Sequence, residues 1–212
     1  MNIIENTILK DELKYKNSVV LKYKIEYPQI TQSSYEIGKQ AFNRYNKNKA
    51  YKLEQYTRTA IYNNAKEFYD YNHANGNLKM FYELNLKPNI TYNKNYIVSL
   101  YYDQYEFTGG AHGSTIRTSQ TWDLRTGKQF ELSYFFHNNQ YYIIKILKSI
   151  NSQIKEQISS GNGFYFDDYY QLILDTFRLE NYYITENGIV VYFQQYDIAP
   201  YSSGILEFNI SK

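Results

Sequence analysis

The sequence predicts an α+β fold in which antiparallel sheets pack with helices, in two closely associated subdomains. Apolar residues alternate with polar ones over 18–27, which is the period of a half-buried strand. Apolar residues recur at spacings of three and four over 34–73 and 139–159, which is the period of an amphipathic helix. Strands follow one another in pairs instead of alternating with helices, so the pattern disfavours a doubly wound parallel sheet.

The length of 212 residues fits one large domain or two small ones, since domains contain roughly 100–200 residues. We place the division near residue 130, which gives subdomains 1–130 and 131–212. Hydrophobic residues make up 43% of the chain and charged residues 21%, so the chain can bury a core and is not disordered throughout.

Two strands and a long helix are predicted at the start of the chain. The strands cover 3–9 and 18–27, and the second ends at Pro28 because proline cannot donate to a strand ladder. Ser33, with a glutamate three residues later, forms the pattern of a capping box and predicts the start of the helix. The polar stretch 43–52 leaves open whether this helix is continuous or divided.

Three strands follow the helix, at 78–92, 95–108 and 114–124, and Asn93-Lys94 is predicted to connect the first two. Asn187-Gly188 is typical of a two-residue turn between later strands. The remaining predicted elements are one helical turn over 132–136, a helix over 139–159, a short helix capped by Asp167 or Asp168, and strands over 181–185, 189–195 and 205–210.

The composition excludes several kinds of chemistry. The chain has no cysteine, so it has no disulfide, thiolate metal site or cysteine nucleophile. Its histidines, His73, His112 and His137, are not spaced as paired metal ligands, and no carboxylate run has the spacing of a calcium loop. There is neither a P-loop nor a G-x-G-x-x-G motif. We therefore expect no metal and no cofactor.

Charge is low overall but uneven. A formal charge of +2 argues against a nucleic-acid partner bound through a general basic field. Residues 1–106 carry 15 Lys and Arg against 11 Asp and Glu, whereas 107–212 carry 8 against 10. An acidic second half can attract a cationic partner, or it can be a solvated face. Its acidic residues include Asp167, Asp168, Asp175, Glu180, Glu186 and Asp197. Basic residues of the long helix, which would contact an anionic wall polymer or only solvent, are Lys39, Arg44, Lys47, Lys49 and Lys52.

Tyrosine accounts for 27 of the 212 residues. A low-GC genome enriches Tyr, Asn, Lys and Ile together, so composition bias is the simplest explanation. Tyrosine also supplies contact area at low entropic cost, which suits a binding surface. The two explanations are compatible.

The chain shows no signal for crossing or entering a membrane. It has no run of about 18 apolar residues, and residues 1–17 lack the apolar segment of a signal peptide. We expect either a cytosolic protein or one whose targeting segment lies outside this sequence, with membrane attachment only through such a segment.

A set of motifs is more specific than composition. Tyr105-Glu-Phe-Thr-Gly-Gly-Ala-His-Gly113 is followed by Trp122-Asp-Leu-Arg-Thr-Gly-Lys128 and by Phe130-Glu-Leu-Ser-Tyr-Phe-Phe136. Tyr196-Asp-Ile-Ala-Pro-Tyr-Ser-Ser-Gly204 comes near the end of the chain. In these motifs the chain resembles the paired domains DUF4163 and DUF3298, over nearly its whole length.

The resemblance implies a biological setting more than a chemistry. Such domains occur as the extracytoplasmic part of anti-sigma factors similar to the lysozyme-sensing one, and beside polysaccharide deacetylase domains that act on the cell wall. The resemblance therefore implies an extracytoplasmic, non-enzymatic binding or sensing module of the bacterial cell envelope. Its partner would be a lysozyme-like protein or a cell-wall glycan.

A glycine-rich loop is the first candidate functional segment. Gly109, Gly110 and Gly113 permit positive φ and close backbone approach around His112. We expect a special connection between two strands, with the imidazole hydrogen-bonded to backbone. The alternative is a hydrolase whose general base, orienting carboxylate and nucleophile are His112, Asp103 or Asp123, and Ser114.

The segment 196–204 is the predicted partner-contact loop. Proline and glycine restrict its backbone, so exposed tyrosines there would be pre-organised for binding. In the alternative, the same residues only pack the loop onto the sheet. The candidate contact residues are Tyr196, Asp197, Pro200, Tyr201 and Gly204.

Overall fold

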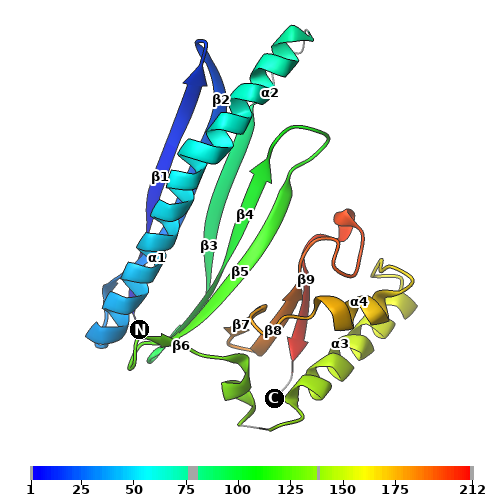
Figure 1. Ribbon diagram of the computed structural model, residues 1–212. Coiled ribbons are helices and arrows are strands. Elements are labelled where there is room, and N and C mark those ends of the chain that lie inside the picture. The colour runs from blue at the N-terminus through cyan, green and yellow to red at the C-terminus, as the bar shows by residue number, and fades with distance from the viewer. Residues whose placement is uncertain (1, 76–80, 138, 211–212) are drawn as a thin grey trace. The chain divides into compact units, whose positions relative to one another are not determined.

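The computed structural model describes residues 2–75, 81–137 and 139–210, and it confirms the α+β class (Figure 1). The chain forms two compact units that interleave along the sequence. The first unit contains the chain up to Pro88 together with 102–115 and 124–127, and the second contains 89–101, 116–123 and the chain from Lys128 onward. The division into 1–130 and 131–212 stays a prediction.

The strands form two sheets. The larger has the order β1-β2-β3-β4-β5-β6 and the smaller the order β7-β8-β9. β1 and β2 are antiparallel, whereas β2 and β3 are parallel and need the long helix as their connection. The strands are β1 (Ile3–Tyr15), β2 (Ser18–Gln32), β3 (Tyr82–Lys94), β4 (Ile97–Phe107), β5 (Ser114–Asp123), β6 (Lys128–Gln129), β7 (Tyr182–Thr185), β8 (Gly188–Phe193) and β9 (Leu206–Ile210).

The helical segments include one π-helical and two 3-10 stretches. Within the described ranges, no helix has both the length and the apolar character that crossing a bilayer requires. The segments are α1 (Glu36–Tyr56), the π-helical η1 (Thr57–Ile61), α2 (Tyr62–Ala74), the 3-10 turn η2 (Leu132–Phe136), α3 (Tyr142–Ser159), α4 (Tyr169–Thr176) and the 3-10 turn η3 (Tyr201–Ser203).

The alternation predicted for β2 is confirmed, since Leu21, Tyr23 and Ile25 are at most 3% exposed. The predicted end of this strand at Pro28 is wrong. Pro28 pairs with β1 opposite Asn6, but the pairing of β2 with β3 ends at Ile25, so β3 does not need the missing N–H of the proline.

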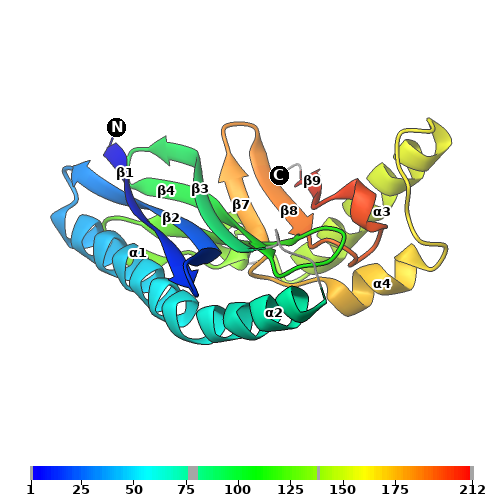
Figure 2. The same ribbon diagram turned by 90° about the horizontal axis from the view of Figure 1, so that it is seen from above.

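The long helix is continuous through the polar stretch 43–52, and Figures 1 and 2 show it running along β1, β2 and β3 of the first unit. Its irregularity is the π-helical turn η1 instead. The capping box predicted from Ser33 is not formed, because Ser33 Oγ accepts a hydrogen bond from Tyr35 N at 3.0 Å and α1 begins at Glu36 without a side-chain cap.

A buried polar group explains the continuity of the helix. Asn46, inside the polar stretch, is fully buried. Its Nδ2 donates to Phe42 O at 2.9 Å, and its Oδ1 accepts a hydrogen bond from Tyr102 Oη at 2.7 Å. The amide is thus satisfied, and this part of α1 can face the core.

Lys49 lies one helical turn from Asn46, with its Nζ 4.4 Å from the centre of the Tyr102 ring. Burial lowers the pKa of Lys49 to about 8 from an ordinary value of 10.5. Because the pKa in the folded state lies below the unfolded value, the ammonium destabilises the fold below about pH 8. This destabilisation disappears as the pH rises toward 10.5, because the folded protein then holds the lysine in its neutral form.

We therefore expect Lys49→Met to raise the unfolding free energy by about 1–3 kcal/mol at pH 7. The gain should shrink at pH 10, where the parent lysine is largely neutral. Urea unfolding of both proteins at the two pH values measures this. A variant less stable than the parent at pH 7 would show that the contact of the ammonium with Tyr102 outweighs its desolvation.

The second unit confirms the helical turn at 132–136 and the amphipathic helix α3. Ile146, Ile150 and Ile154 of α3 are fully buried against the smaller sheet, and Gln153 Nε2 donates to Asn209 O of β9 at 2.9 Å. Asp168 stands at the predicted N-cap of α4 but makes no side-chain cap.

The hairpin turns lie one or two residues from their predicted places. β3 and β4 are joined through residues 95–96, where Asn95 has φ +54°, and not through Asn93-Lys94. β7 and β8 are joined through residues 186–187, with Gly188 already in β8. Residues 78–80 of the strand predicted at 78–92 lie outside the described residues.

Candidate functional site

The loop between β8 and β9 contains all five predicted contact residues, and its base is fixed to β5. Arg117 N donates to Gln194 Oε1 at 2.9 Å, and Gln194 Nε2 donates to Arg117 O at 2.7 Å. The side-chain amide of Gln194 thus bonds to both the backbone N–H and the backbone C=O of Arg117, as the backbone of a neighbouring strand would. This pairing fixes where the loop begins.

Asp197 closes the base of the loop. Its Oδ2 accepts a hydrogen bond from Gln194 N at 2.7 Å, and Asp197 N donates to Gln194 O at 3.2 Å. Burial raises the pKa of Asp197, although the hydrogen bond from Gln194 N and the charge of Arg178 oppose this shift. The carboxylate therefore has a structural task in the loop, and it is not a freely exposed charge.

Tyr196 is the most exposed of the predicted contact residues, with 55% of its surface accessible. Its φ of +68° is unfavourable for a residue with a Cβ atom, by about 1–2 kcal/mol. Its ring centre lies 5.7 Å from that of Tyr201, with the planes tilted by 35°. The loop base thus holds a tyrosine pair in a strained but defined conformation.

Buried residues and a backbone hydrogen bond hold the rest of the loop in place. Ile198 and Ala199 are buried, and Ile198 O accepts a hydrogen bond from Phe166 N at 3.1 Å. Pro200 precedes η3, and Gly204 has φ +68° and ψ −150°, a conformation that is essentially restricted to glycine. Of the five predicted residues, Tyr196 is exposed, Tyr201 is half-buried beside it, and the others set the backbone.

Arg117 supports this loop from within the second unit, and no sequence pattern identified it. Its side chain is buried, its guanidinium lies 3.7 Å from the centre of the Tyr101 ring, and it forms an ion pair with Glu207. Arg117 stands in β5 among polar residues with no apolar period, so periodicity could not identify it as a buried residue.

The glycine-rich loop lies in the first unit between β4 and β5. A Cβ atom on Gly109 would lie 2.5 Å from the Phe68 ring, and one on Gly113 would lie 2.5 Å from the Tyr105 ring. Gly109 and Gly110 also have φ of +91° and +95°. Packing and backbone conformation together account for these glycines.

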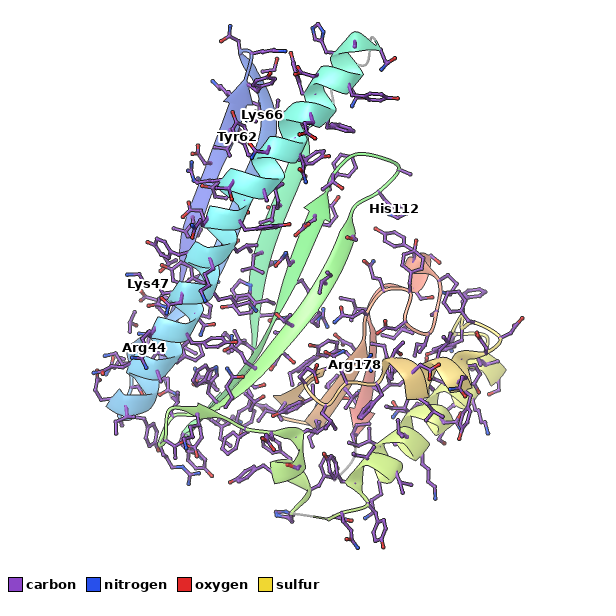
Figure 3. All side chains as sticks on the ribbon, in the orientation of Figure 1. Arg44, Lys47, Tyr62, Lys66, His112 and Arg178 are labelled. Atoms are coloured by element: carbon purple, nitrogen blue, oxygen red, sulfur yellow. The ribbon has the colours of Figure 1, made fainter. Side chains whose placement is uncertain are left out.

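His112 in the same loop (Figure 3) has its Nδ1 3.0 Å from Gly113 O. That carbonyl takes the place on Nδ1 that an orienting carboxylate would need in a hydrolase. Asp123, one of the two carboxylates considered for that role, is buried in β5 and belongs to the second unit. The geometry gives His112 a contact with backbone, as the first interpretation predicts.

The charged candidates differ in exposure. Asp167 and Asp168 are both exposed ahead of α4. Arg44 and Lys47 project from α1 (Figure 3), and Lys47 Nζ lies 5.7 Å from the centre of the Tyr51 ring. The described residues hold no group of three or more His, Asp or Glu side chains that could share a metal ion.

Comparison with known families covers most of the chain. Residues 14–115 match the family model described as deacetylase PdaC, and residues 133–212 match the model of DUF3298, a protein family of unknown function. The second match confirms the predicted DUF3298 resemblance, whereas the DUF4163 label of the first half stays a prediction. No curated protein matches the chain.

Solved structures share the fold. A DUF3298 family member from Bacteroides fragilis NCTC 9343 has a TM-score of 0.70 at 16% identity, over 99% of this chain and 90% of that one. A DUF3298 family protein from Pseudomonas aeruginosa PAO1 has a TM-score of 0.61 at 15% identity, with the same coverage. The chain is thus similar to the PdaC family model over residues 14–115 and to the DUF3298 model over residues 133–212, and it shares its fold with solved DUF3298 structures.

Proposed function

We propose that the chain is a non-enzymatic binding module of the bacterial cell envelope, and that it contacts a basic, lysozyme-like protein through the loop 194–204. The observation that carries the proposal is the exposed Tyr196, held at positive φ beside Tyr201 by the base that Gln194 and Asp197 form. A conformation fixed before binding lowers the entropic cost of association.

The chemistry of the surroundings favours a protein partner that is basic. Phe164, 77% exposed, lies close in the chain to Phe166, which is hydrogen-bonded to the loop, and aromatic side chains are enriched at the centres of protein interfaces. The two residues that follow Phe166 in the chain, Asp167 and Asp168, are both exposed. Their charge favours the approach of a cationic protein.

Calorimetry against a c-type lysozyme and, separately, against soluble peptidoglycan fragments tests the proposal. We expect saturable binding of lysozyme, weakened roughly tenfold or more by Tyr196→Ala because an anchor side chain is removed. Tyr71→Ala is the control, since Tyr71 is also an exposed tyrosine, with 71% of its surface accessible, and stands on α2 of the first unit. Equal losses in both variants would contradict a role for the loop.

The charge argument has its own variant. Asp167→Asn/Asp168→Asn should lower lysozyme affinity and flatten its dependence on salt, because exposed charges are screened over about 10 Å at 0.1 M salt. Asp197 is unsuitable for this test because its carboxylate holds the loop. Binding of glycan fragments alone would replace the protein partner by a wall polymer, and binding of neither ligand would refute the proposed function.

A further inference from the structure

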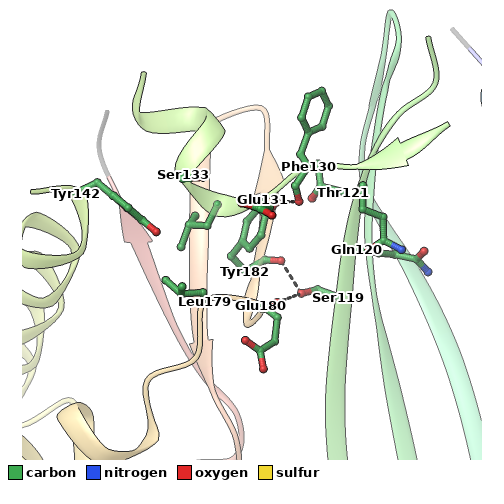
Figure 4. Close-up of a pocket in the computed structure, with 12 residues that line it drawn as sticks. Ser119, Gln120, Thr121, Phe130, Glu131, Ser133, Tyr142, Leu179, Glu180 and Tyr182 are labelled. Carbon is green, nitrogen blue, oxygen red and sulfur yellow. Dashed lines mark hydrogen bonds between the residues drawn. The ribbon is translucent and has the colours of Figure 1, made fainter. Parts of the chain in front are cut away.

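The second unit contains a cavity of about 370 Å³ (Figure 4), and the motif that begins at Phe130 supplies part of its lining. It lies between β5, the segment that joins β6 to η2, the start of α3, and the segment before β7. This volume falls in the usual range for ligand pockets, about 300–1,000 Å³. The lining residues are Ser119, Gln120, Thr121, Gln129, Phe130, Glu131, Leu132, Ser133, Tyr142, Leu179, Glu180 and Tyr182.

Hydrogen bonds hold one side of the cavity in place. Ser119 Oγ lies 3.0 Å from Glu180 O and 2.5 Å from Tyr182 O, which Figure 4 marks with dashed lines. Tyr182 Oη donates in turn to Phe130 O at 2.6 Å. Three of the segments that line the cavity are thus tied to one another, so the cavity is formed before any ligand arrives.

Aromatic and apolar side chains supply the walls. Tyr182 is buried. The ring of Phe130 packs on the ring of Tyr134, with the ring centres 4.3 Å apart and the planes tilted by 33°. Tyr142 and Leu179 also line the cavity. Such walls suit a ligand with an extended hydrocarbon part.

The charged side chains that line the cavity are acidic. Glu131 and Glu180 come from two different segments, and both are exposed. Neither carboxylate is hydrogen-bonded or ion-paired within the described part of the chain. Among the described residues that line the cavity there is no Lys, Arg or His. A cationic group entering the cavity would therefore meet two available acceptors and no competing cation.

We propose that this cavity receives the side chain of a lysine or arginine that the protein partner presents. The hydrocarbon stem would lie against Tyr142 and Tyr182, and the cationic head would pair with Glu131 and Glu180. The proposal deepens the proposed function and rests on it for the source of the side chain. Either basic residue type fits a partner that is cationic.

The cavity and the tyrosine loop are built on the same strand. Arg117 and Ser119 stand two residues apart in β5, and the Tyr192 hydroxyl lies 3.1 Å from Ser119 Oγ and 3.5 Å from Arg117 O. Arg117 positions the loop through Gln194, whereas Ser119 positions the cavity wall. One partner can therefore engage both features.

The test uses the full chain and two small probes, Nα-acetyl-lysine methylamide and its uncharged analogue Nα-acetyl-norleucine methylamide. We expect the lysine probe to shift the NMR signals of Ser119, Glu131 and Ser133, and the norleucine probe to do so much more weakly. Glu131→Gln/Glu180→Gln should lower the affinity for the lysine probe roughly tenfold, because two exposed ion pairs are lost. Glu156→Gln/Glu186→Gln, which removes two exposed charges elsewhere in the unit, should leave it unchanged.

The outcomes separate this proposal from the proposed function. Lysine-probe binding that is unaffected by Tyr196→Ala, in a chain that does not bind lysozyme, would support the cavity and refute the proposed partner. Lysozyme affinity that falls in the Glu131→Gln/Glu180→Gln variant supports both. Absence of lysine-probe shifts, equal shifts with norleucine, or shifts at these residues from peptidoglycan fragments alone would overturn the cavity proposal.

Discussion

Gly38→Ala is expected to lower the unfolding free energy by about 3 kcal/mol or more. Gly38 is buried in α1, and a Cβ atom there would lie 2.1 Å from Leu124 O and 2.2 Å from Leu124 Cα. Both are backbone atoms of the same unit, so the clash cannot be relieved by a side-chain rotation. Relief requires α1 or the turn after β5 to move.

The sign of the effect makes this variant informative. In an exposed helix interior, replacing glycine by alanine stabilises a protein by about 1 kcal/mol, so destabilisation at Gly38 must come from the close approach. Urea unfolding measures the difference. Gly161→Ala is the control, since no atom lies within 4 Å of its added Cβ and only its φ of +71° opposes the change. A Gly38→Ala protein as stable as the parent would contradict the approach of α1 to Leu124.

Local periodicity predicted the elements whose apolar faces are buried within one unit. In β2 the alternation corresponds to Leu21, Tyr23 and Ile25, which are at most 3% exposed. In α3 the spacing corresponds to Ile146, Ile150 and Ile154, which are fully buried. These patterns are set by the face that each element buries, and that information is local in the sequence. The α+β class followed from them.

Other features depend on partners far along the chain. β1 extends to Tyr15 although most of its residues are exposed, because its length is set by pairing with β2. Pro28 is tolerated because β3 does not pair with that part of β2, which no local pattern can indicate. The sequence left the continuity of the long helix open for the same reason, since Tyr102 in β4 satisfies Asn46 in α1.

The candidate site divides in the same way. Proline, glycine and tyrosine in 196–204 identified the loop, because each restricts the backbone or supplies contact area locally. Gln194 and Arg117 were missed, since the two lie 77 residues apart and carry polar side chains whose burial only the tertiary structure reveals. The cavity was missed for the same reason, as its lining comes from four separate segments.

Arg117→Met is expected to lower the unfolding free energy by about 2–4 kcal/mol. The guanidinium lies 3.7 Å from the Tyr101 ring centre and 5.8 Å from that of Tyr192, and it pairs with Glu207. Methionine keeps an unbranched apolar side chain but removes the stacking, the charge and the hydrogen bonds of the guanidinium. Because 42% of the Glu207 side chain is exposed, water can solvate its carboxylate, and most of the loss comes from the tyrosine contacts.

Comparison with Gln194→Ala separates stability from loop geometry. The pairing of Gln194 with Arg117 uses the backbone of Arg117, so Arg117→Met retains it and should keep most of the lysozyme affinity at temperatures where the variant is folded. Gln194→Ala removes both hydrogen bonds, frees the loop that carries Tyr196, and should weaken lysozyme binding with a smaller change in stability. Urea unfolding and calorimetry on both variants measure the two effects. If Arg117→Met weakened binding as strongly as Gln194→Ala while remaining folded, the guanidinium itself, and not the backbone of β5, would position the loop.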